Sequence, residues 1–429
     1  MYSHTKSRDL GVCYVIAKIL ERMGCESFVA STHNCASKTV RLWRPHAIFY
    51  TTLNATINLK TIYPKAKLFF CSGEGSNNYA QDQEEYLLAN NSEIFNSISR
   101  IYLWGRRQKK FILAHIKDHK ENSFLYGKEY LIDEKCLIVG HPRLSLIKYA
   151  NSMNNDKKKV RIGFMGSFAK INFIDATRGP LYMVLQGREN DSELLSFQIA
   201  LIKLYRDIIS KLGVDRYSFS IRPYPLENME CYYKTKLVKD GVLEMDDSVD
   251  FGVWLKKIDL LIGPTTSTIS QIAAAKIPFI NLDFLCKRSS SEYMGTTIKD
   301  FLEDLENHFP KSDDELYYKI DNYKDCIISD AKLLEKFDDV YSINNNYPAL
   351  LSISDDMMSV LQQEIHKINR SFPIKLFSFI NAAKLKFLIK NSITYSYFNY
   401  KDMSPQLIKQ LDPIVANILS KAKNGKIKA

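Results

Sequence analysis

Short apolar segments alternate with amphipathic segments along most of this chain, and the alternation starts twice. In the first 150 residues we predict buried parallel strands in the apolar runs at 27–30, 47–50, 68–71, 101–104 and 136–139. The run 151–159 is polar and charged apart from Met153, and we interpret it as a linker. The pattern then resumes, with predicted strands at 160–165, 217–221, 259–262 and 278–282. Helical spacing of apolar residues predicts helices at 10–23, 194–212 and 268–275.

Two successive sets of this kind predict an α/β protein with two doubly wound, Rossmann-like domains facing a cleft. The length of 429 residues is too great for one ordinary core, which agrees with two domains or more. We place an N-terminal domain at 1–150, a second domain at 151–345, and a helical extension at 346–429. Few residues precede the first predicted helix, so the first strand is either very short or lies upstream.

The net charge of +11 predicts a polyanionic partner: nucleic acid, an anionic membrane or a phosphate-bearing substrate. After residue 371 the sequence carries ten lysines and only two acidic residues, so part of the excess lies in the C-terminal extension. This tail either docks on the anionic inner face of the cytoplasmic membrane or packs on the second domain. We see no helix-turn-helix, RRM or KH signature, and we expect no nucleic-acid partner.

The eight cysteines are scattered, without the paired spacing of a zinc site or a disulfide framework. No run approaches the roughly 18 apolar residues of a membrane span, and the N-terminus lacks the apolar core of a signal peptide. These features predict a cytoplasmic protein, with peripheral membrane contact as an option.

Glu74 lies between two glycines directly after the predicted strand 68–71. Ligands of open α/β sheets collect at the carboxyl ends of the strands, so this carboxylate is expected to face the cleft. It can act there as a general base for an acceptor hydroxyl, and Gly75 lets the backbone approach a substrate. An ordinary solvent-exposed turn is the structural alternative.

Hydroxyl side chains fill the sequence between the predicted strand 259–262 and the helix after it: Thr265, Thr266, Ser267 and Thr268. Hydroxyls and free N–H groups at a helix N-terminus bind anions, and four hydroxyls exceed what helix capping needs. Arg222, at the end of the strand 217–221, offers a bidentate fork to a phosphate. The alternative for Arg222 is a structural partner for a surface carboxylate.

Four further residues stand at predicted strand ends or in nearby loops. His141 and Arg143 follow the last strand of the first domain, where they either position a substrate or form a turn that redirects the chain. Asp175 and Arg178 follow the first strand of the second domain, where the cleft is expected. Asp175 is a candidate nucleophile if the reaction retains anomeric configuration.

The order of short motifs resembles a known family: RDL near the start, EG after a strand, YLWG, VGHPR before the linker, IRPYP and GPTTST before a helix. The pattern resembles bacterial surface carbohydrate (capsule or lipopolysaccharide) biosynthesis proteins of the GT-B type. It is also similar to CMP-sugar-dependent transferases, including sialyltransferases and Kdo transferases. The resemblance covers roughly residues 1–285.

The resemblance implies a glycosyltransferase that moves a sugar from a nucleotide donor, with a CMP-sugar favoured, onto a surface polysaccharide or a lipid-linked glycan. It implies that Glu74 is the catalytic base and that the hydroxyl cluster binds the nucleotide phosphate. A His-Pro motif of that group corresponds here to Tyr224 and Pro225, so tyrosine replaces the imidazole. Arg8, in the RDL motif, is included among the substrate-binding candidates.

No DxD-type metal signature is present, so the sequence predicts no obligatory metal and no cofactor beyond the nucleotide-sugar co-substrate. Three alternatives stay open. One is transfer of a glycerol-phosphate unit from CDP-glycerol on the same fold. The others are a catalytically inactive partner in polysaccharide assembly and a nucleic-acid-binding protein.

Overall fold

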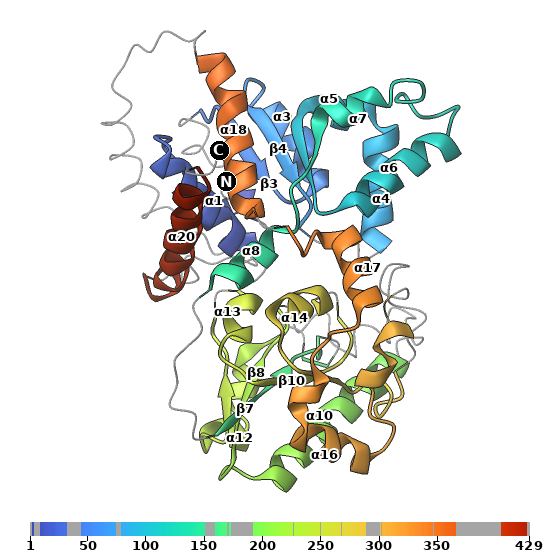
Figure 1. Ribbon diagram of the computed structural model, residues 1–429, viewed down its shortest axis with the longest axis vertical. Helices are drawn as coiled ribbons and strands as arrows, with labels where there is room; N and C mark the ends of the chain where they lie inside the picture. Colours follow the sequence, from blue (N-terminus) through green and yellow to red (C-terminus); the bar gives the residue numbers. More distant parts are fainter. Residues whose placement is uncertain are drawn as a thin grey trace. The chain divides into compact units, whose positions relative to one another are not determined.

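The chain forms two compact units, shown in a computed structural model (Figure 1). The first unit comprises Met1–Ala150 together with Phe337–Ala429, and the second comprises Asn151–Lys336. The structure describes residues 2–3, 9–31, 44–73, 79–150, 159–169, 171–172, 192–225, 227–248, 250–266, 268–288, 301, 303–345, 347–365 and 405–426.

The first unit contains a parallel sheet of six strands in the order β2-β1-β3-β4-β5-β6. Each of its longer strands coincides with an apolar run, because side chains on both faces of a parallel sheet are buried. The first strand is short, with two residues, and it pairs with β2 and β3. The strands are β1 (Tyr2–Ser3), β2 (Ala30–Ser31), β3 (Ala47–Tyr50), β4 (Lys67–Cys71), β5 (Ile98–Leu103) and β6 (Cys136–Ile138).

Helices cover both faces of this sheet. One core contains Tyr50, Phe70 and Phe95, and the opposite face carries Phe69 stacked on Tyr102. The helices of the first 150 residues are α1 (Gly11–Arg22), η2 (Leu53–Ala55), α3 (Thr56–Ile62), α4 (Tyr79–Asn90), α5 (Ser92–Ser97), α6 (Arg106–Asp118), α7 (Tyr130–Lys135) and α8 (Pro142–Tyr149).

The chain returns to the first unit inside α17 (Ala331–Tyr341) and continues through α18 (Ala349–Ile365) and α20 (Pro405–Lys426). Helices α18 and α20 both pack on α1 and α8 (Figure 1). The Tyr14 hydroxyl donates to Asp412 at 2.9 Å, and the Tyr102 hydroxyl donates to Asp356 at 2.8 Å. The C-terminal helices are therefore part of the first unit. The sequence predicts instead a separate extension at 346–429, with packing on the second domain as one of two alternatives for it.

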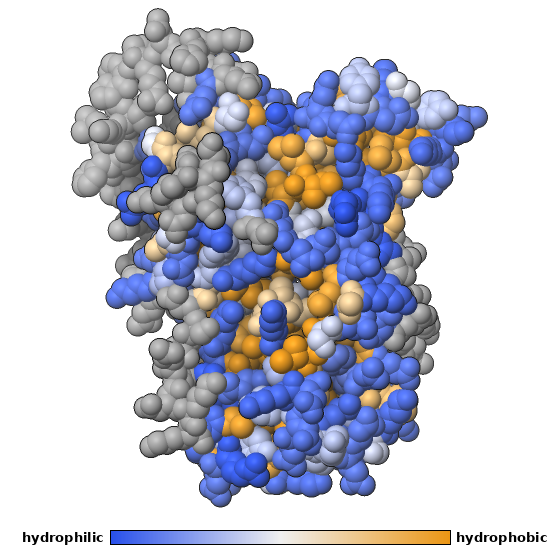
Figure 2. All heavy atoms as spheres, viewed as in Figure 1, coloured by the Kyte–Doolittle hydropathy of each residue, from blue (hydrophilic) through white to orange (hydrophobic). Residues whose placement is uncertain are grey.

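The apolar stripe of α20 explains this packing. Leu411, Ile414 and Ile418 recur at helical spacing and are buried, whereas Lys409 and Lys421 are exposed. Hydrophilic side chains cover most of the visible face of both units, with smaller groups of hydrophobic ones between them (Figure 2). Among the described residues, no helix combines the length and the apolar character that a membrane crossing requires.

The second unit contains a parallel sheet of five strands in the order β11-β10-β7-β8-β9. From β7 the chain proceeds to β8 and β9 on one side and then to β10 and β11 on the other, so a topological switch point lies between β7 and β10. The strands are β7 (Val160–Met165), β8 (Tyr217–Arg222), β9 (Leu243–Met245), β10 (Leu260–Gly263) and β11 (Phe279–Asn281).

The core of the second unit lies between this sheet and helix α10, with Phe164, Tyr205 and Phe219 among its aromatic residues. The helices are α10 (Ser192–Leu212), α11 (Met229–Tyr233), α12 (Lys236–Lys239), α13 (Phe251–Leu255), α14 (Ile269–Ala275), η5 (Glu303–His308), α16 (Asp313–Asp321) and η6 (Tyr323–Cys326). Two doubly wound parallel sheets confirm the predicted α/β fold class.

Candidate active site

The segment between β10 and α14 lies at the switch point of the second sheet, and Thr265 anchors it. The Thr265 N–H donates to both carboxylate oxygens of Asp283 at 3.2 Å, and the Thr265 hydroxyl accepts from Asn281 at 2.6 Å. The Thr265 carbonyl accepts from Arg288 Nη1 at 2.8 Å. All three polar groups of this residue, which is only 2% exposed, are thus used within the protein. A phosphate contact by Thr265 stays a prediction, and the described bonds assign it a structural role.

The next described hydroxyls are more accessible. Thr266 and Thr268 are half-buried, and their hydroxyl oxygens lie 2.6 Å apart. The Thr268 N–H donates to the Thr266 hydroxyl at 3.1 Å, and α14 begins at Ile269. This pair holds two hydroxyls together at the carboxyl edge of the sheet, where a phosphate of a bound nucleotide is expected. Ser267 lies outside the described residues.

Arg222 ends β8 and is bound to a buried carboxylate. Its Nη1 donates to Asp246 and to the Ser248 carbonyl, the latter at 3.0 Å. The side chains of Arg222 and Asp246 are 11% and 2% exposed. Lys257 also contacts Asp246 at 3.4 Å, so two cations share one carboxylate. The arrangement matches the structural alternative for Arg222, as the partner of a carboxylate.

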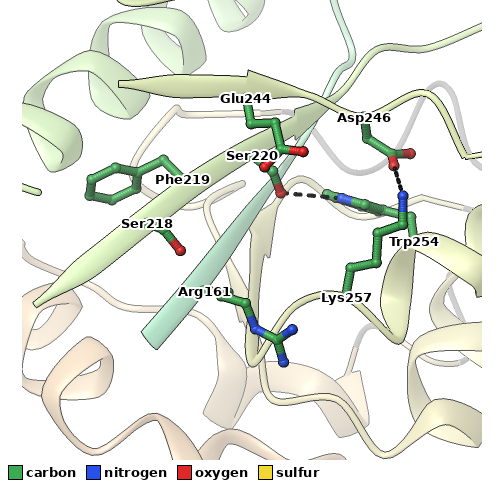
Figure 3. A pocket seen from close by; sticks show the side chains of 8 residues that line it. All are labelled: Arg161, Ser218, Phe219, Ser220, Glu244, Asp246, Trp254 and Lys257. Atoms are coloured by element: carbon green, nitrogen blue, oxygen red, sulfur yellow. Dashed lines mark hydrogen bonds and ion pairs between the residues drawn. The ribbon is translucent and has the colours of Figure 1, made fainter. Parts of the chain in front are cut away.

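A polar pocket lies on the sheet face next to this ion pair (Figure 3). Side chains alternate along β8, so Phe219 joins the core while Ser218 and Ser220 face the other way. The Trp254 indole N–H donates to the Ser220 hydroxyl at 3.2 Å. Figure 3 shows the Lys257 amino group directed at Asp246. The pocket is lined by Arg161, Ser218, Phe219, Ser220, Glu244, Asp246, Trp254 and Lys257.

Tyr224 and Pro225 follow β8 and are exposed. The Tyr224 carbonyl accepts the Glu227 N–H at 2.9 Å, which closes a short turn. This position at the carboxyl edge is compatible with the nucleotide-binding roles predicted for both residues, which stay predictions.

Glu227 is a buried carboxyl group that sequence reasoning missed. It is 1% exposed, and it accepts hydrogen bonds from the Tyr232 hydroxyl and from the Phe168 N–H. A Cβ atom on Gly166 would lie 2.8 Å from a Glu227 oxygen and 2.7 Å from the Pro223 Cα, so only glycine fits there. Glu227 thus fastens the loop after β7 to the turn after β8. Burial raises the pKa of Glu227 to about 7.

This raised pKa makes the stability of the second unit depend on pH. The folded state keeps the Glu227 proton up to about pH 7, whereas an ordinary glutamate loses it near 4.5. The stabilisation is therefore complete below the unfolded pKa and is lost as pH rises through the folded pKa. Glutamine at this position cannot ionise. Between pH 5 and pH 8 we therefore expect the free energy of unfolding of Glu227→Gln to rise by about 2–3 kcal/mol relative to that of wild type.

Urea unfolding of wild type and Glu227→Gln at pH 5 and pH 8 measures this difference. The exposed Glu244→Gln serves as the matched control and should follow wild type at both pH values. If the two proteins differ in free energy of unfolding by the same amount at pH 5 and pH 8, Glu227 is ionised throughout this range and the account of its pKa is wrong.

In the first unit, Gly73 lies shortly after β4 and directly precedes Glu74 in the sequence. Its N–H donates to the Thr51 carbonyl at 2.9 Å, and its carbonyl accepts from Arg143 Nη2 at 2.8 Å. A Cβ atom on Gly73 would lie 2.9 Å from a carboxylate oxygen of Asp9 and 3.1 Å from the Thr51 carbonyl oxygen. The structure therefore brings Arg143 to the base of the segment that carries Glu74, as part of a tightly packed carboxyl edge.

His141 is buried rather than open to a substrate. Its ring stacks on Trp104 with centroids 3.8 Å apart, and its Nδ1 accepts the Arg143 N–H at 3.1 Å as the cap of α8. The His141 N–H donates to the Tyr341 carbonyl at 3.0 Å. Burial lowers the pKa of His141 well below its ordinary value, so the ring is neutral at pH 7. These contacts favour the turn-forming alternative, and substrate binding by His141 stays a prediction.

Several predicted site residues fall outside the part of the chain that the structure describes. They are Arg8, Glu74, Gly75, Asp175, Arg178 and Ser267. Their roles stay predictions from sequence. Glu227, Asp246, Asp283 and Arg288 instead emerge from the structure, because their burial depends on tertiary contacts that no local sequence pattern encodes.

No protein-family model matches the chain, and no curated protein matches it in sequence. Among solved structures, a variant of the wall teichoic acid polymerase TagF soaked with CDPG aligns with a TM-score of 0.53 and 11% identity, over 85% of this chain and 88% of that chain. MnaA from S. aureus, in a structure with UDP, aligns with a TM-score of 0.46 and 11% identity, over 87% of this chain and 97% of that chain.

The UDP-GlcNAc 2-epimerase of Methanocaldococcus jannaschii, in complex with UDP-GlcNAc and UDP, aligns at 0.46 and 9% identity, over 83% and 98% of the two chains. The likeness to TagF at this low identity shows the fold alone. The chain therefore has a GT-B-like fold of two doubly wound α/β units.

Proposed function

We propose that this protein is a GT-B glycosyltransferase that transfers a sugar from a cytidine nucleotide donor to a bacterial surface glycan. A CMP-sugar is the favoured donor, and a growing polysaccharide or a lipid-linked glycan is the acceptor. The observation that carries the proposal is the hydroxyl pair of Thr266 and Thr268 at the switch point of the second sheet. In open α/β sheets this is where ligands bind.

The fold likeness supports this reading and a close alternative. The TagF structure was soaked with CDPG, and a CDP-glycerol donor shares its cytidine with a CMP-sugar. Transfer of a glycerol-phosphate unit from CDP-glycerol is therefore the second candidate. Both donors place a cytidine and at least one phosphate at the same sheet edge.

The proposed chemistry has a nucleotide side and an acceptor side. One hydroxyl of the Thr266–Thr268 pair donates to the other, and the second hydroxyl donates to the nucleotide phosphate. The remaining donors of Arg222 stabilise the phosphate charge as the sugar bond breaks. Glu74 takes the proton of the acceptor hydroxyl, so the acceptor oxygen forms the new bond to the anomeric carbon while the nucleotide phosphate leaves. This scheme needs no cofactor and no obligatory metal, because fixed donors offset the phosphate charge.

The acceptor side of the proposal concerns the membrane. A lipid-linked glycan resides at the inner face of the cytoplasmic membrane, and we propose that the protein acts there from the cytoplasm. The lysine-rich residues after 371 supply the positive charge for peripheral contact with anionic lipid.

Calorimetric titration of the full chain with CMP, CDP, UDP and GDP tests the donor proposal. We expect saturable binding of CMP and CDP, and at least tenfold weaker binding of UDP and GDP. Equal binding of all four would leave the nucleotide site but remove the preference for cytidine. If none binds while duplex DNA binds at physiological salt, the nucleic-acid alternative replaces the proposal.

A further inference from the structure

The turn 283–288 follows β11 and is fastened to the segment that carries the hydroxyl pair. Strand pairing sets Gly263 opposite Asn281, so the residues that follow the two strands lie at one edge of the sheet. Asp283 accepts the Thr265 N–H, and Arg288 donates to the Thr265 carbonyl. The turn is closed by the Arg288 N–H, which donates to the Asp283 carbonyl at 2.9 Å. Both segments therefore hold one fixed position relative to each other.

Phe284 stands out on this turn because its neighbours Asp283 and Leu282 are buried while its own side chain is 54% exposed. Its ring carries no polar group, so the exposure serves no hydrogen bond. Phe284 directly follows Asp283, whose carboxylate accepts the Thr265 N–H at 3.2 Å, so it belongs to the stretch of chain that contacts the start of the hydroxyl-bearing segment. An exposed aromatic ring beside a phosphate site is the platform on which a nucleobase stacks.

We propose that Phe284 is the stacking platform for the pyrimidine base of the donor nucleotide. This inference rests on the proposed function, since it needs a nucleotide whose phosphate lies at Thr266 and Thr268. The base packs against the ring face, and the bonds of Asp283 and Arg288 hold the turn that carries Phe284 against Thr265.

Lys287 adds charge to the same turn. Its side chain is exposed, and its backbone has a φ of 52°, which non-glycine residues adopt rarely. The Lys287 N–H donates to the Phe284 carbonyl at 3.0 Å, so the two side chains belong to one rigid turn.

Paired ligands separate base stacking from phosphate binding. Calorimetry on the full chain would compare CMP and CDP, which carry the base, with ribose 5-phosphate and pyrophosphate, which lack it. We expect Phe284→Ala to weaken CMP and CDP binding about 5- to 100-fold and to leave the two base-free ligands unchanged. Phe284→Tyr should retain wild-type affinity, because the ring remains.

Tyr318→Ala removes another exposed aromatic residue of the same unit, on α16, and is the matched control. Loss of CMP affinity in Phe284→Ala but not in Tyr318→Ala supports the inference. If wild type binds CMP and Phe284→Ala binds it equally well, the inference is wrong while the proposed function stands. An equal loss for base-free ligands would also overturn it, since Phe284 would then shape the phosphate site. If wild type binds no nucleotide, the proposed function itself fails.

Discussion

Glu74→Gln is expected to lower the rate of glycosyl transfer by about 10²- to 10⁴-fold while nucleotide affinity stays at the wild-type level. A general base contributes by removing the acceptor proton as the new bond forms, and glutamine cannot accept that proton. Nucleotide binding is assigned to the other unit, so the substitution should act on the rate alone.

The residue that directly precedes Glu74, Gly73, is held in place by its neighbours. Gly73 is held by hydrogen bonds to Thr51 and Arg143, and it has no room for a side chain. The segment that carries Glu74 therefore starts from a fixed point at the carboxyl end of β4.

The measurement is transfer of labelled sugar at saturating donor, alongside calorimetric titration with CMP. Glu121→Gln, on an exposed turn of the same unit, is the matched control and should keep full activity. Full activity of Glu74→Gln would remove this residue from the mechanism. A parallel loss of CMP affinity would show that the substitution acts on the fold rather than on the proton transfer.

Asp246→Asn is expected to destabilise the second unit by about 3 kcal/mol, the largest stability effect that we predict. The substitution keeps the shape of the side chain but leaves Arg222 and Lys257 without a compensating charge. Arg222 is largely buried, so water cannot replace the lost partner. Urea unfolding of wild type and variant measures the change, and Asp247→Asn, at an exposed neighbouring position, is the control.

A double-mutant cycle separates the charge effect from general disruption. Combining Asp246→Asn with Arg222→Met removes both charges, and the double variant should recover part of the lost stability. Additive losses in the double variant would contradict the account, because they would show that the two side chains are not coupled.

The sequence alone predicted most of the fold because parallel strands buried on both faces appear as continuous apolar runs. Strand β10 was found in this way, and helix α10 was found from the helical spacing of its apolar residues, both within two residues of their observed bounds. Strand β9 was missed, since its three residues include the exposed Glu244 and form no apolar run. The packing of α20 on α1 was also missed, because an amphipathic stripe indicates that a helix is covered but not by which element.

The site was less predictable for a related reason. Arg222 was recognised from its place at a strand end, but its partner Asp246 follows 24 residues later in a polar stretch that resembles a surface loop. The anchoring of Thr265 by Asp283 depends on the pairing of β10 with β11, which no local pattern encodes. Buried polar networks of this kind are defined by tertiary contacts, so the sequence indicates the motif and the structure supplies its supports.

The central claim is that the chain transfers a sugar from a cytidine nucleotide, and donor turnover tests it most directly. The full chain would be incubated with CMP-, CDP-, UDP- and GDP-linked donors and a bacterial lipid-linked glycan fraction, and release of each free nucleotide would be followed by chromatography. The account predicts CMP release that depends on the acceptor and is matched by sugar incorporation into the glycan. Acceptor-dependent turnover of only the UDP- or GDP-linked donors, or of none of the four, would contradict it.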